Sequence, residues 1–489
     1  MSAPAVRRPL VLAAVMASMA MIAVEATIVS TAMPQIAAQM GDLHLYSWVF
    51  SAFLLTQTAF TPVFGKLADT YGRRPVMLVG IAVFLIGSTL CGFATSMVAL
   101  IGFRLLQGIG AGAIQPIGMT VVGDLYTIEE RARIQGWLAS VWGISSVVGP
   151  LAGGLIVQHV SWAWVFWINL PIGLVSAIGF ARYMREPERG GARTVDVAGA
   201  ALFTLGVAAL MVLLTELGDG PAQVLAGSAL VAVAAFAAFA WQETRAREPM
   251  VAFRLWARRP IATANAATLF SGAALVGLTT FLPMYVQGVL NQSPLVAGFT
   301  LSVMVLGWPI GSTIAARAFG RFGLRSTLVF GGFLLPVGAA PFLLLGAGSS
   351  PLLAGAGSVV MGLGMGFLSV SAVVLIQDCV GWGERGAATA SNMFARSLGS
   401  TVGAAVLGAV LNLGLAGAGT EAPVSLDDVR QLLDAGAALP GDGAIRTALG
   451  AAIHNTFLSV FALSLLTLLL ATLVPRIVAR SGPRELTVE

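Results

Sequence analysis

Fourteen apolar runs, each long enough to cross a lipid bilayer, divide almost the whole chain. A hydrocarbon core of about 30 Å needs about 20 helical residues to cross it. Backbone polar groups in lipid must pair within the chain, so we expect helices throughout. The predicted spans are 10–32, 46–66, 76–95, 98–121, 135–157, 163–183, 197–217, 223–242, 261–286, 295–316, 327–346, 352–377, 388–411 and 455–475.

Composition supports a membrane protein and excludes a soluble one. The chain is 57% hydrophobic and only 10% charged, whereas soluble domains are about 25% charged. A formal charge of +5 would suggest nucleic acid in a soluble protein, but basic residues in short loops here are expected to set membrane orientation. The predicted fold class is an all-α polytopic membrane protein. Its partner is the lipid bilayer, and no nucleic acid is expected.

The basic residues test this arrangement, because they gather on the cytoplasmic side of membrane proteins. With a cytoplasmic N-terminus and alternating spans, 23 of the 27 Lys and Arg residues fall in inner segments. Arg104 and Arg396 lie inside spans, and only Arg430 and Arg446 face outside. We therefore predict an even number of spans, both termini inside, and a location in the cytoplasmic (inner) membrane.

An internal repeat divides the chain into two similar halves. The segment GKLADTYGRR (65–74) aligns with ARAFGRFGLR (316–325) at a fixed offset of 251. The alignment matches Gly72 with Gly323, Arg74 with Arg325, and Tyr71 with Phe322. Duplicated halves are typical of transporters whose site lies between the repeats.

The repeat sets the predicted domain organisation. We expect a six-helix half over 1–190, two inserted helices and a linker over 191–258, and a second six-helix half over 259–489. The second half contains the one long outer loop, 412–454.

No signature of metal, cofactor or nucleotide chemistry is present. The three histidines and two cysteines show no ligand or disulfide spacing, and no Gly-x-x-x-x-Gly-Lys-[Ser/Thr] loop occurs. We expect no metal, no cofactor and no ATP hydrolysis by this chain, so that transport would draw on an ion gradient. One Glu and two Arg within spans are also poor support for an enzyme.

The loop between the second and third spans combines turn glycines with charge. Gly72 permits backbone angles that other residues avoid, and Arg73 and Arg74 hold the turn on the cytoplasmic side. Asp69 is an acid at a helix end, so it needs a partner such as an arginine or the N-terminus of a neighbouring helix. A purely structural turn would explain the glycines but not the pairing of Asp69 with Arg73.

The same loop resembles the signature loop of the major facilitator superfamily. RLLQGIGAG (104–112) is similar to the superfamily's fourth-helix motif, and GPLAGG (149–154) to the fifth-helix motif of its drug antiporters. EATIVSTAMP (25–34) resembles the first-helix motif of the fourteen-span drug:proton antiporters. The resemblance covers essentially the whole chain, and it implies the major facilitator fold with two six-helix repeats and two inserted helices.

The resemblance implies a gating role for the loop motif. Asp69 is expected to meet the start of the thirteenth span, around Gly386 to Thr389, when the inner end is closed, with Arg73 bracing it. The second copy has Gly320 where the first has Asp69, so the two inner loops are not equivalent. The gating residues are then Gly65, Asp69, Gly72, Arg73 and Arg74.

The fifth-helix motif places Gly149, Pro150, Gly153 and Gly154 in the outer half of its span. Pro150 removes a helix donor and is expected to bend the helix, and the glycines permit close approach of another helix. Ordinary close packing accounts for these residues, whereas the resemblance implies an antiport hinge and seal.

Glu25 is the one acidic residue placed deep within a predicted span. A charge at mid-bilayer costs at least about 2.5–3.5 kcal/mol, so such acids usually have a function. Arg104 lies at similar depth, about 10 Å below the outer surface at 1.5 Å per residue, and the resemblance implies neighbouring helices. Glu25 is then either a structural partner of Arg104 or the carrier of the coupled proton, competing with substrate. In a third alternative, Arg104 extends alone to the surface without pairing with Glu25. The family motif usually has Asp at this position.

Other polar residues within spans are candidates for lining a cavity or bridging helices. For Arg396, a structural pair with Asp378 or Glu384 and a role in transport are both open. The candidates are Gln57, Gln107, Gln115, Asn392 and Arg396.

These features together predict a transporter. The predicted function is proton-coupled efflux (antiport) of small amphipathic, often cationic drugs across the cytoplasmic membrane, by a chain expected to work as a monomer. The alternative is a dedicated proton-coupled exporter of a single metabolite, lipid or natural product.

Overall fold

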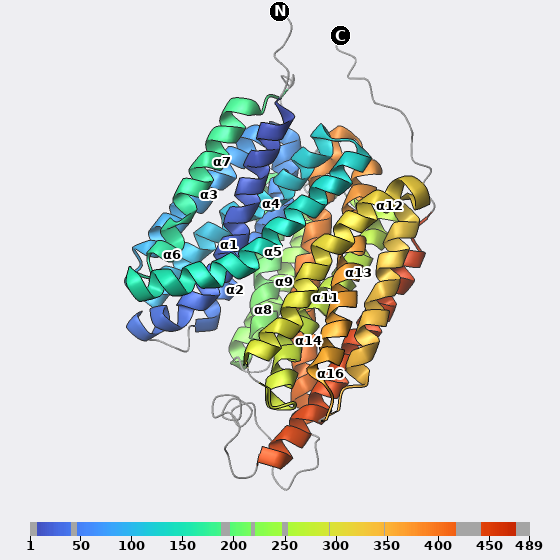
Figure 1. Ribbon diagram of the computed structural model, residues 1–489. Coiled ribbons are helices and arrows are strands. Elements are labelled where there is room, and N and C mark those ends of the chain that lie inside the picture. The colour runs from blue at the N-terminus through green and yellow to red at the C-terminus, as the bar shows by residue number, and fades with distance from the viewer. Residues whose placement is uncertain are drawn as a thin grey trace, which may run out of the picture.

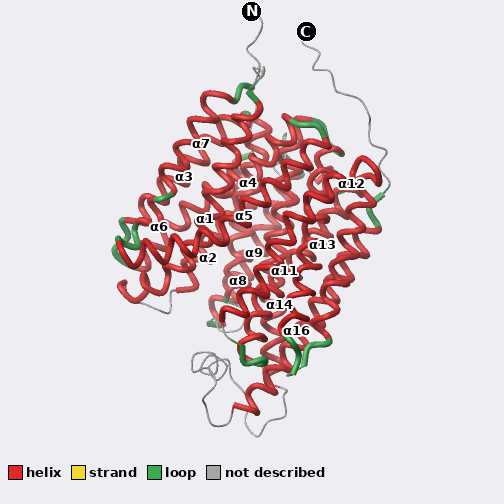
Figure 2. Tube along the Cα trace, in the orientation of Figure 1, coloured by secondary structure: helices red, strands yellow, loops and turns green. Residues whose placement is uncertain are grey.

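The computed structural model describes residues 7–40, 46–186, 196–216, 221–246, 253–292, 294–346, 348–416 and 442–475. Within these ranges the chain forms helices and no strands. The long helices lie roughly side by side in one elongated bundle (Figures 1 and 2). The all-helical class predicted from the apolar runs is therefore confirmed.

The first part of the bundle is built from helices that begin at polar caps. Ser96 accepts a hydrogen bond from the amide of Ala99 at the start of the fourth helix, and Thr127 and Glu130 form a capping box at the start of the fifth. The helices are α1 (Arg8–Met40), α2 (Tyr46–Tyr71), α3 (Arg73–Gly92), α4 (Met97–Leu125), α5 (Ile128–His159), α6 (Trp164–Trp167) and α7 (Asn169–Tyr183).

The remainder of the bundle contains a helix pair and a second group of long helices. The pair is α8 (Val197–Thr215) and α9 (Ala222–Glu243). The second group comprises α10 (Phe253–Trp256), α11 (Arg259–Gly288), α12 (Pro294–Leu343), α13 (Pro351–Asp378), the 3₁₀ helix η2 (Trp382–Glu384), α14 (Arg385–Ala416) and α16 (Asp442–Thr472). The largest apolar core lies within this second group, and the next largest lies within α1 to α7.

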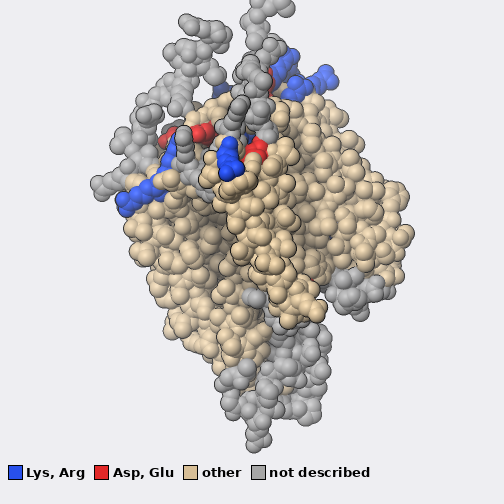
Figure 3. Space-filling view, turned by 180° about the vertical axis from the view of Figure 1, so that it is seen from behind, with Lys and Arg blue, Asp and Glu red and all other residues tan. Residues whose placement is uncertain are grey.

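The surface of the bundle is that of a membrane protein. Eleven helical segments among the described residues are long and apolar enough to cross a membrane. Large apolar side chains such as Leu151, Val175 and Leu344 are exposed, as expected where lipid covers a helix. Figure 3 shows the charged side chains of the visible face gathered at one end, above an uncharged flank. The chain is therefore a multi-pass membrane protein, as predicted.

The internal repeat is visible in the backbone. Gly72 has φ of 109° and Gly323 has φ of 79°, and they are the two glycines with positive φ among the described residues. Gly323 also breaks α12 into two helical pieces. Arg74 donates to the carbonyl of Ala181 near the end of α7, at 2.5 Å, and its counterpart Arg325 donates to carbonyls at the end of α16. Equivalent turns therefore fasten the last helix of each repeat.

The two inserted helices lie against both groups. Phe203 of α8 contacts Phe239 of α9 and Phe394 of α14, with ring centroids 5.3 and 5.5 Å apart. In the same apolar cluster, Val63 of α2 packs beside these rings. The pair is thus a lateral brace over the junction of α2 and α14, consistent with its place between the other helices in Figure 1.

The predicted bounds of the outer loop, 412–454, are wrong at both ends. Helix α14 continues to Ala416 and α16 begins at Asp442, while residues 417–441 lie outside the described residues. Leu449 and Ile453 are fully buried in the apolar core, and Arg446 donates to the carbonyl of Gly288 at 2.7 Å. The apolar run used for the prediction does not reach this part of α16, because Asp442, Arg446 and His454 interrupt it.

Helix α1 is also longer than the span predicted for it, 10–32. Its apolar run ends at Pro34, but α1 continues to Met40. Ile36 is fully buried beside Val49 and Phe166, so packing stabilises the helix beyond the proline. Membrane helices tolerate proline because neighbouring groups compensate for the lost backbone hydrogen bond.

Close packing at glycine gives the first test. A Cβ at Gly110 of α4 would overlap the backbone nitrogen of Phe84 in α3, whereas one at Gly102 of the same helix meets nothing within 4 Å among the described residues. Gly110→Ala should therefore destabilise the purified protein by about 1–3 kcal/mol, measured by thermal unfolding in detergent. Gly102→Ala is the matched control, and equal melting temperatures for the two variants would contradict this packing.

Candidate functional site

The first candidate site is the carboxylate of Glu25, buried in the middle of α1. Its side chain is 0% exposed. It accepts hydrogen bonds from Arg104 on α4 and from Asn169 at the start of α7. The expected pair of Glu25 and Arg104 is therefore present. Its partners all come from α1 to α7, so the pair lies inside one group of helices and not between the two groups.

Arg104 connects this carboxylate to α2. Its Nε donates to the carbonyl of Val49 at 3.2 Å, and its guanidinium carbon lies 4.3 Å from the ring centre of Phe53. A second N–H donor bonds Gln107 at 2.8 Å. The arginine is 2% exposed, so it does not reach the surface. A shift of α2 would change the partners of the arginine that neutralises Glu25.

Two further residues complete the polar cluster. Ser88 of α3 accepts hydrogen bonds from Asn169 at 3.0 Å and from Gln107 at 3.1 Å, and it donates to the carbonyl of Phe166 at 2.8 Å. Ser88 was not singled out from the sequence, because one serine in an apolar run carries no signal. Asn169 stands out only as a lone amide in the run WVFWINLPIG. Its Oδ1 has no hydrogen-bond partner among the described residues.

The cluster is chemically suited to hold one negative charge and to respond to its loss. Removing one partner of a buried ion pair costs about 3–5 kcal/mol, because the other charge is left uncompensated. The donors around Glu25 all stabilise its ionised form. Protonation would therefore weaken the hold of α4 and α7 on α1.

The fifth-helix motif packs close to this cluster. A Cβ at Gly149 would overlap the hydroxyl of Thr27 on α1, two residues from Glu25, and Thr27 also donates to the carbonyl of Ser145 at 3.0 Å. Close approach of another helix is therefore confirmed at Gly149. Gly153 is buried, and the side chain of Pro150 lies outside the described residues.

The last glycine of this motif has no described residue packed closely against it. At Gly154 an added Cβ meets nothing within 4 Å among the described residues. Gly154 is partly buried, whereas Gly153 is buried.

The second candidate site joins α2 to the start of α14. The carboxylate of Asp69 accepts hydrogen bonds from the amides of Gly386 at 3.0 Å and Ala387 at 2.7 Å, and Arg73 lies 2.8 Å from the same carboxylate. The position expected for Asp69 at the start of the thirteenth predicted span is confirmed. An acid at a helix N-terminus is stabilised by unpaired amides and by the helix dipole. We call this the inner contact.

Arg73 extends the inner contact to two more elements. It is 0% exposed, bonds Asp124 of α4 at 3.0 Å, and donates to the carbonyl of Trp382 at 2.6 Å. Asp124 also pairs with Arg385 of α14 at 3.1 Å. The sequence does not point to Asp124 or Arg385, because both lie outside the loop motif and their neighbours in the chain do not reveal their partners.

Gly65 allows the backbones of the inner contact to meet. A Cβ there would overlap that of Ala390 on α14 and approach the carbonyl oxygen of Gly386. Gly65, Asp69 and Arg73 therefore belong to one contact, whereas Gly72 and Arg74 form the turn that follows it.

The remaining polar candidates do not form a single site. Gln107 belongs to the Glu25 cluster, whereas Gln57 and Gln115 are half-buried with no side-chain hydrogen bond among the described residues. Asn392 bridges α14 to α11 by bonds to Asn265 at 3.1 Å and Thr268 at 2.9 Å. We therefore assign Asn392 to helix bridging.

Arg396 is half-buried and bonds Ser369 at 3.2 Å. No ion pair of Arg396 with Asp378 or Glu384 occurs among the described residues, and Glu384 pairs instead with Arg258 at 3.4 Å. The structural pair considered for Arg396 is therefore not formed, because Arg396 lies about three helical turns into α14, away from Glu384 at its start.

Helical repeats around buried polar clusters define a membrane transporter, and comparison with known proteins gives the family. The sequence model of the family described as Major Facilitator Superfamily matches residues 12–404 of this chain. The chain therefore belongs to the Major Facilitator Superfamily, whose members and relatives here are transporters and not enzymes.

Named relatives are drug and efflux transporters. The multidrug transporter protein MdtP of Bacillus subtilis is 35% identical over 410 residues, covering 83% of this chain and 76% of the relative. Multidrug resistance protein 3 of the same organism is 33% identical over 468 residues, covering 92% and 91%. The efflux pump FUS6 of Gibberella fujikuroi is 32% identical over 408 residues, covering 80% and 72%.

Solved structures share the fold. The human organic anion transporter MFSD10 (TETRAN) superposes with a TM-score of 0.65 at 17% identity, covering 95% of this chain and 99% of that structure. The proton:xylose symporter XylE superposes with a TM-score of 0.61 at 11% identity, covering 94% of each. At these identities the likeness concerns the fold alone.

Proposed function

We propose that this protein exports small amphipathic, often cationic drugs in exchange for protons. The observation that carries the proposal is the fully buried carboxylate of Glu25, held by Arg104 and Asn169. Intramembrane acids in transporters commonly serve as proton relays. The named multidrug relatives support the substrate class. The exchange needs no cofactor and takes place in a monomer.

Asn169 supports a response to protonation. Its Nδ2 group donates to the carboxylate, while its Oδ1 has no partner among the described residues. A protonated Glu25 has a hydrogen to donate, and rotation of the amide about its last bond would present Oδ1 as the acceptor. One side chain thus satisfies both protonation states with different hydrogen bonds.

Helix α2 provides the connection between proton and gate. Its carbonyl at Val49 and its ring at Phe53 hold Arg104, and Asp69 near its other end caps α14. Ionised Glu25 holds Arg104, and protonation of Glu25 releases it. A resulting movement of α2 would then reach the inner contact at the other end of that helix. Two states that differ by a few kcal/mol need only such differential contacts to exchange populations.

We propose the remaining residues in supporting roles. Gly149, Pro150, Gly153 and Gly154 form the hinge and seal of the antiporter, because Gly149 lies against α1 beside Glu25. The half-buried Gln57, Gln115 and Arg396 line the substrate path. That assignment rests on their partial burial.

A dedicated exporter of one metabolite, lipid or natural product is the second candidate. The relative from Gibberella fujikuroi is named an efflux pump and not a multidrug protein, which favours this alternative. Efflux of chemically unrelated dyes from cells that lack other pumps separates the two, because a dedicated exporter moves few of them.

We further propose fourteen spans with both termini in the cytoplasm. Helix α12 counts as two spans because it breaks at Gly323, and α6 with α7 counts as one. The proposed units are residues 1–190, 191–258 and 259–489, and the boundary at 190 lies outside the described residues. The distribution of basic residues supports this orientation in the inner membrane.

The two ends of α9 test the orientation. Gln223 and Thr244 are both exposed, one at each end of the helix, and the native cysteines Cys91 and Cys379 are first replaced by Ala. An impermeant thiol reagent should label Gln223→Cys in intact cells, and Thr244→Cys only after the membrane is opened. Labelling of Thr244→Cys from outside intact cells would overturn the orientation.

Asp69→Asn tests the inner contact as a gate. Neutralising an acid at a helix N-terminus removes about 0.3–2 kcal/mol, which should favour the inward-open state and slow efflux without reducing expression. Glu216→Gln is the matched control, since it removes one carboxylate charge at the end of α8, where no ion pair with another described residue is lost. Transport by Asp69→Asn at the wild-type rate would remove the gate assignment.

Glu25→Gln tests proton coupling. The amide keeps the size of the side chain but cannot ionise, so proton-driven efflux of a cationic dye should be abolished, while binding persists without its pH dependence. Glu25→Asp is the matched control and should keep partial efflux. If Glu25→Gln expels the dye against its gradient at the wild-type rate, Glu25 is a structural partner of Arg104 and coupling lies elsewhere.

A further inference from the structure

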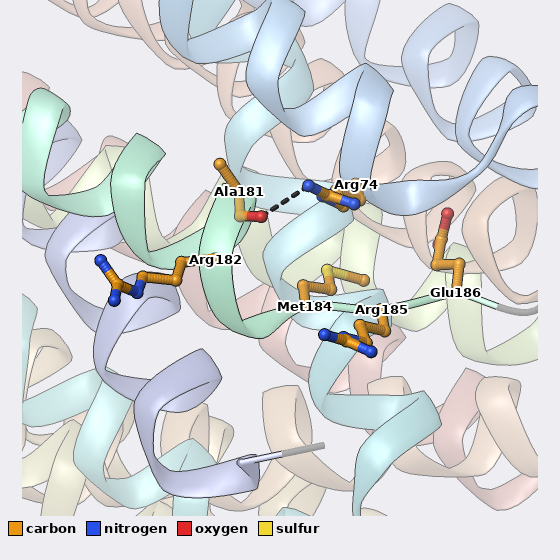
Figure 4. A pocket seen from close by; sticks show the side chains of 6 residues that line it. All are labelled: Arg74, Ala181, Arg182, Met184, Arg185 and Glu186. Atoms are coloured by element: carbon orange, nitrogen blue, oxygen red, sulfur yellow. Dashed lines mark hydrogen bonds between the residues drawn. The ribbon is translucent and has the colours of Figure 1, made fainter. Parts of the chain in front are cut away.

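A basic hollow lies where the beginning of α3 meets the end of α7. Its volume is about 320 Å³, and Figure 4 shows the side chains around it. We define the basic hollow by its lining residues, which are Arg74, Ala181, Arg182, Met184, Arg185 and Glu186. It lies next to the inner contact without belonging to it, since none of these side chains bonds Asp69.

The hollow carries a surplus of positive charge. Arg74 is fixed by its hydrogen bond to the carbonyl of Ala181, while Arg182 and Arg185 are exposed. None of the three arginines forms an ion pair with another described residue. The one acid, Glu186, accepts a hydrogen bond from the backbone amide of Arg73 at 2.6 Å. Three cations therefore face the hollow with one anion that is already engaged.

The arginines stand at the end of a lipid-facing surface. On α7, Arg182 follows Ile178 and Val175 at spacings of four and three residues, so the three lie on one face of the helix. Ile178 is 59% exposed and Val175 67%. On α3, which packs against α7, Val79 is also exposed. Apolar stripes that end in arginine match a molecule with acyl chains and an anionic head group.

We propose that the basic hollow binds the phosphate group of an anionic phospholipid, whose acyl chains lie along the exposed faces of α3 and α7. Arginine suits this ligand because its planar guanidinium donates several hydrogen bonds to phosphate oxygens. Basic pockets between membrane helices are known places for lipid head groups. In Figure 4, Arg74 and Arg185 lie on opposite sides of Met184, and the Arg182 side chain extends away from them on the other side of α7.

The site would persist through the transport cycle. All its lining residues lie between Arg74 and Glu186, within the proposed unit 1–190, so opening the inner contact to α14 does not separate them. Lipid binding should therefore be unchanged by Asp69→Asn, although that variant shifts the gate. This separates failure of the lipid site from failure of the gate assignment.

Native mass spectrometry of the delipidated full chain in detergent tests the proposal. Binding of dioleoyl phosphatidylglycerol is compared with binding of dioleoyl phosphatidylcholine, which has the same acyl chains but no net charge. The wild type should prefer phosphatidylglycerol, and Arg182→Gln with Arg185→Gln should weaken the binding of that lipid by about 25-fold, because each arginine near an anionic head group contributes about fivefold. Arg182→Lys with Arg185→Lys should keep most of the preference.

The matched control removes the same charge elsewhere. Arg317 and Arg321 are exposed on α12 one turn apart, and Arg317→Gln with Arg321→Gln should leave phosphatidylglycerol binding unchanged. Equal binding of the two lipids by the wild type would overturn the proposal, as would equal losses in the two double variants. Displacement of phosphatidylglycerol by inorganic phosphate at equal concentration would also overturn it, because the ligand would then be a soluble anion.

Discussion

The arrangement of this protein depends on close backbone contact between helices at glycine. Lipid tails are as apolar as the side chains they cover, so helices gain little from hydrophobic association and instead depend on packing and hydrogen bonds. At Gly110, and at Gly399 between α14 and α11, even one added carbon would overlap backbone atoms of the neighbouring helix. Contacts this close set helix positions firmly. The hydrogen bonds of Ser88 and Asn169 require such positions, because both residues are fully buried.

Two polar clusters occupy different positions within this packing. The Glu25 cluster lies inside one group of helices and is shielded from water, whereas the inner contact joins two groups through a helix N-terminus. Helix α2 touches both, so they are mechanically connected although they share no hydrogen bond. A buried charge pair is costly to form and costly to break, which makes it a suitable trigger. A capped helix end is worth much less, which makes it a suitable latch.

The inner contact has no counterpart in the second repeat among the described residues. Gly320 stands where Asp69 stands in the first, and an added Cβ there meets nothing within 4 Å among the described residues. The start of α5, which such an acid would cap, is closed by its own Thr127 and Glu130. The turn glycines and the arginines after them are retained in both repeats. The repeats therefore share their folding signals and differ in the contact that joins the two groups.

The sequence by itself determined the helical class and the two repeated turns, and the resemblance of its motifs to the major facilitator superfamily implied the pair of Glu25 with Arg104 and the place of Asp69. Hydropathy, turn glycines and isolated charges are local signals that can be recognised in the sequence without a structure. Only the tertiary structure decided that Asn169 and Ser88 complete the Glu25 cluster and that Asp124 bridges Arg73 to Arg385. It also decided where α1 and α16 extend beyond their apolar runs. The physical reason is that a polar side chain in a membrane helix must find a partner, but which neighbour supplies it depends on how the helices pack.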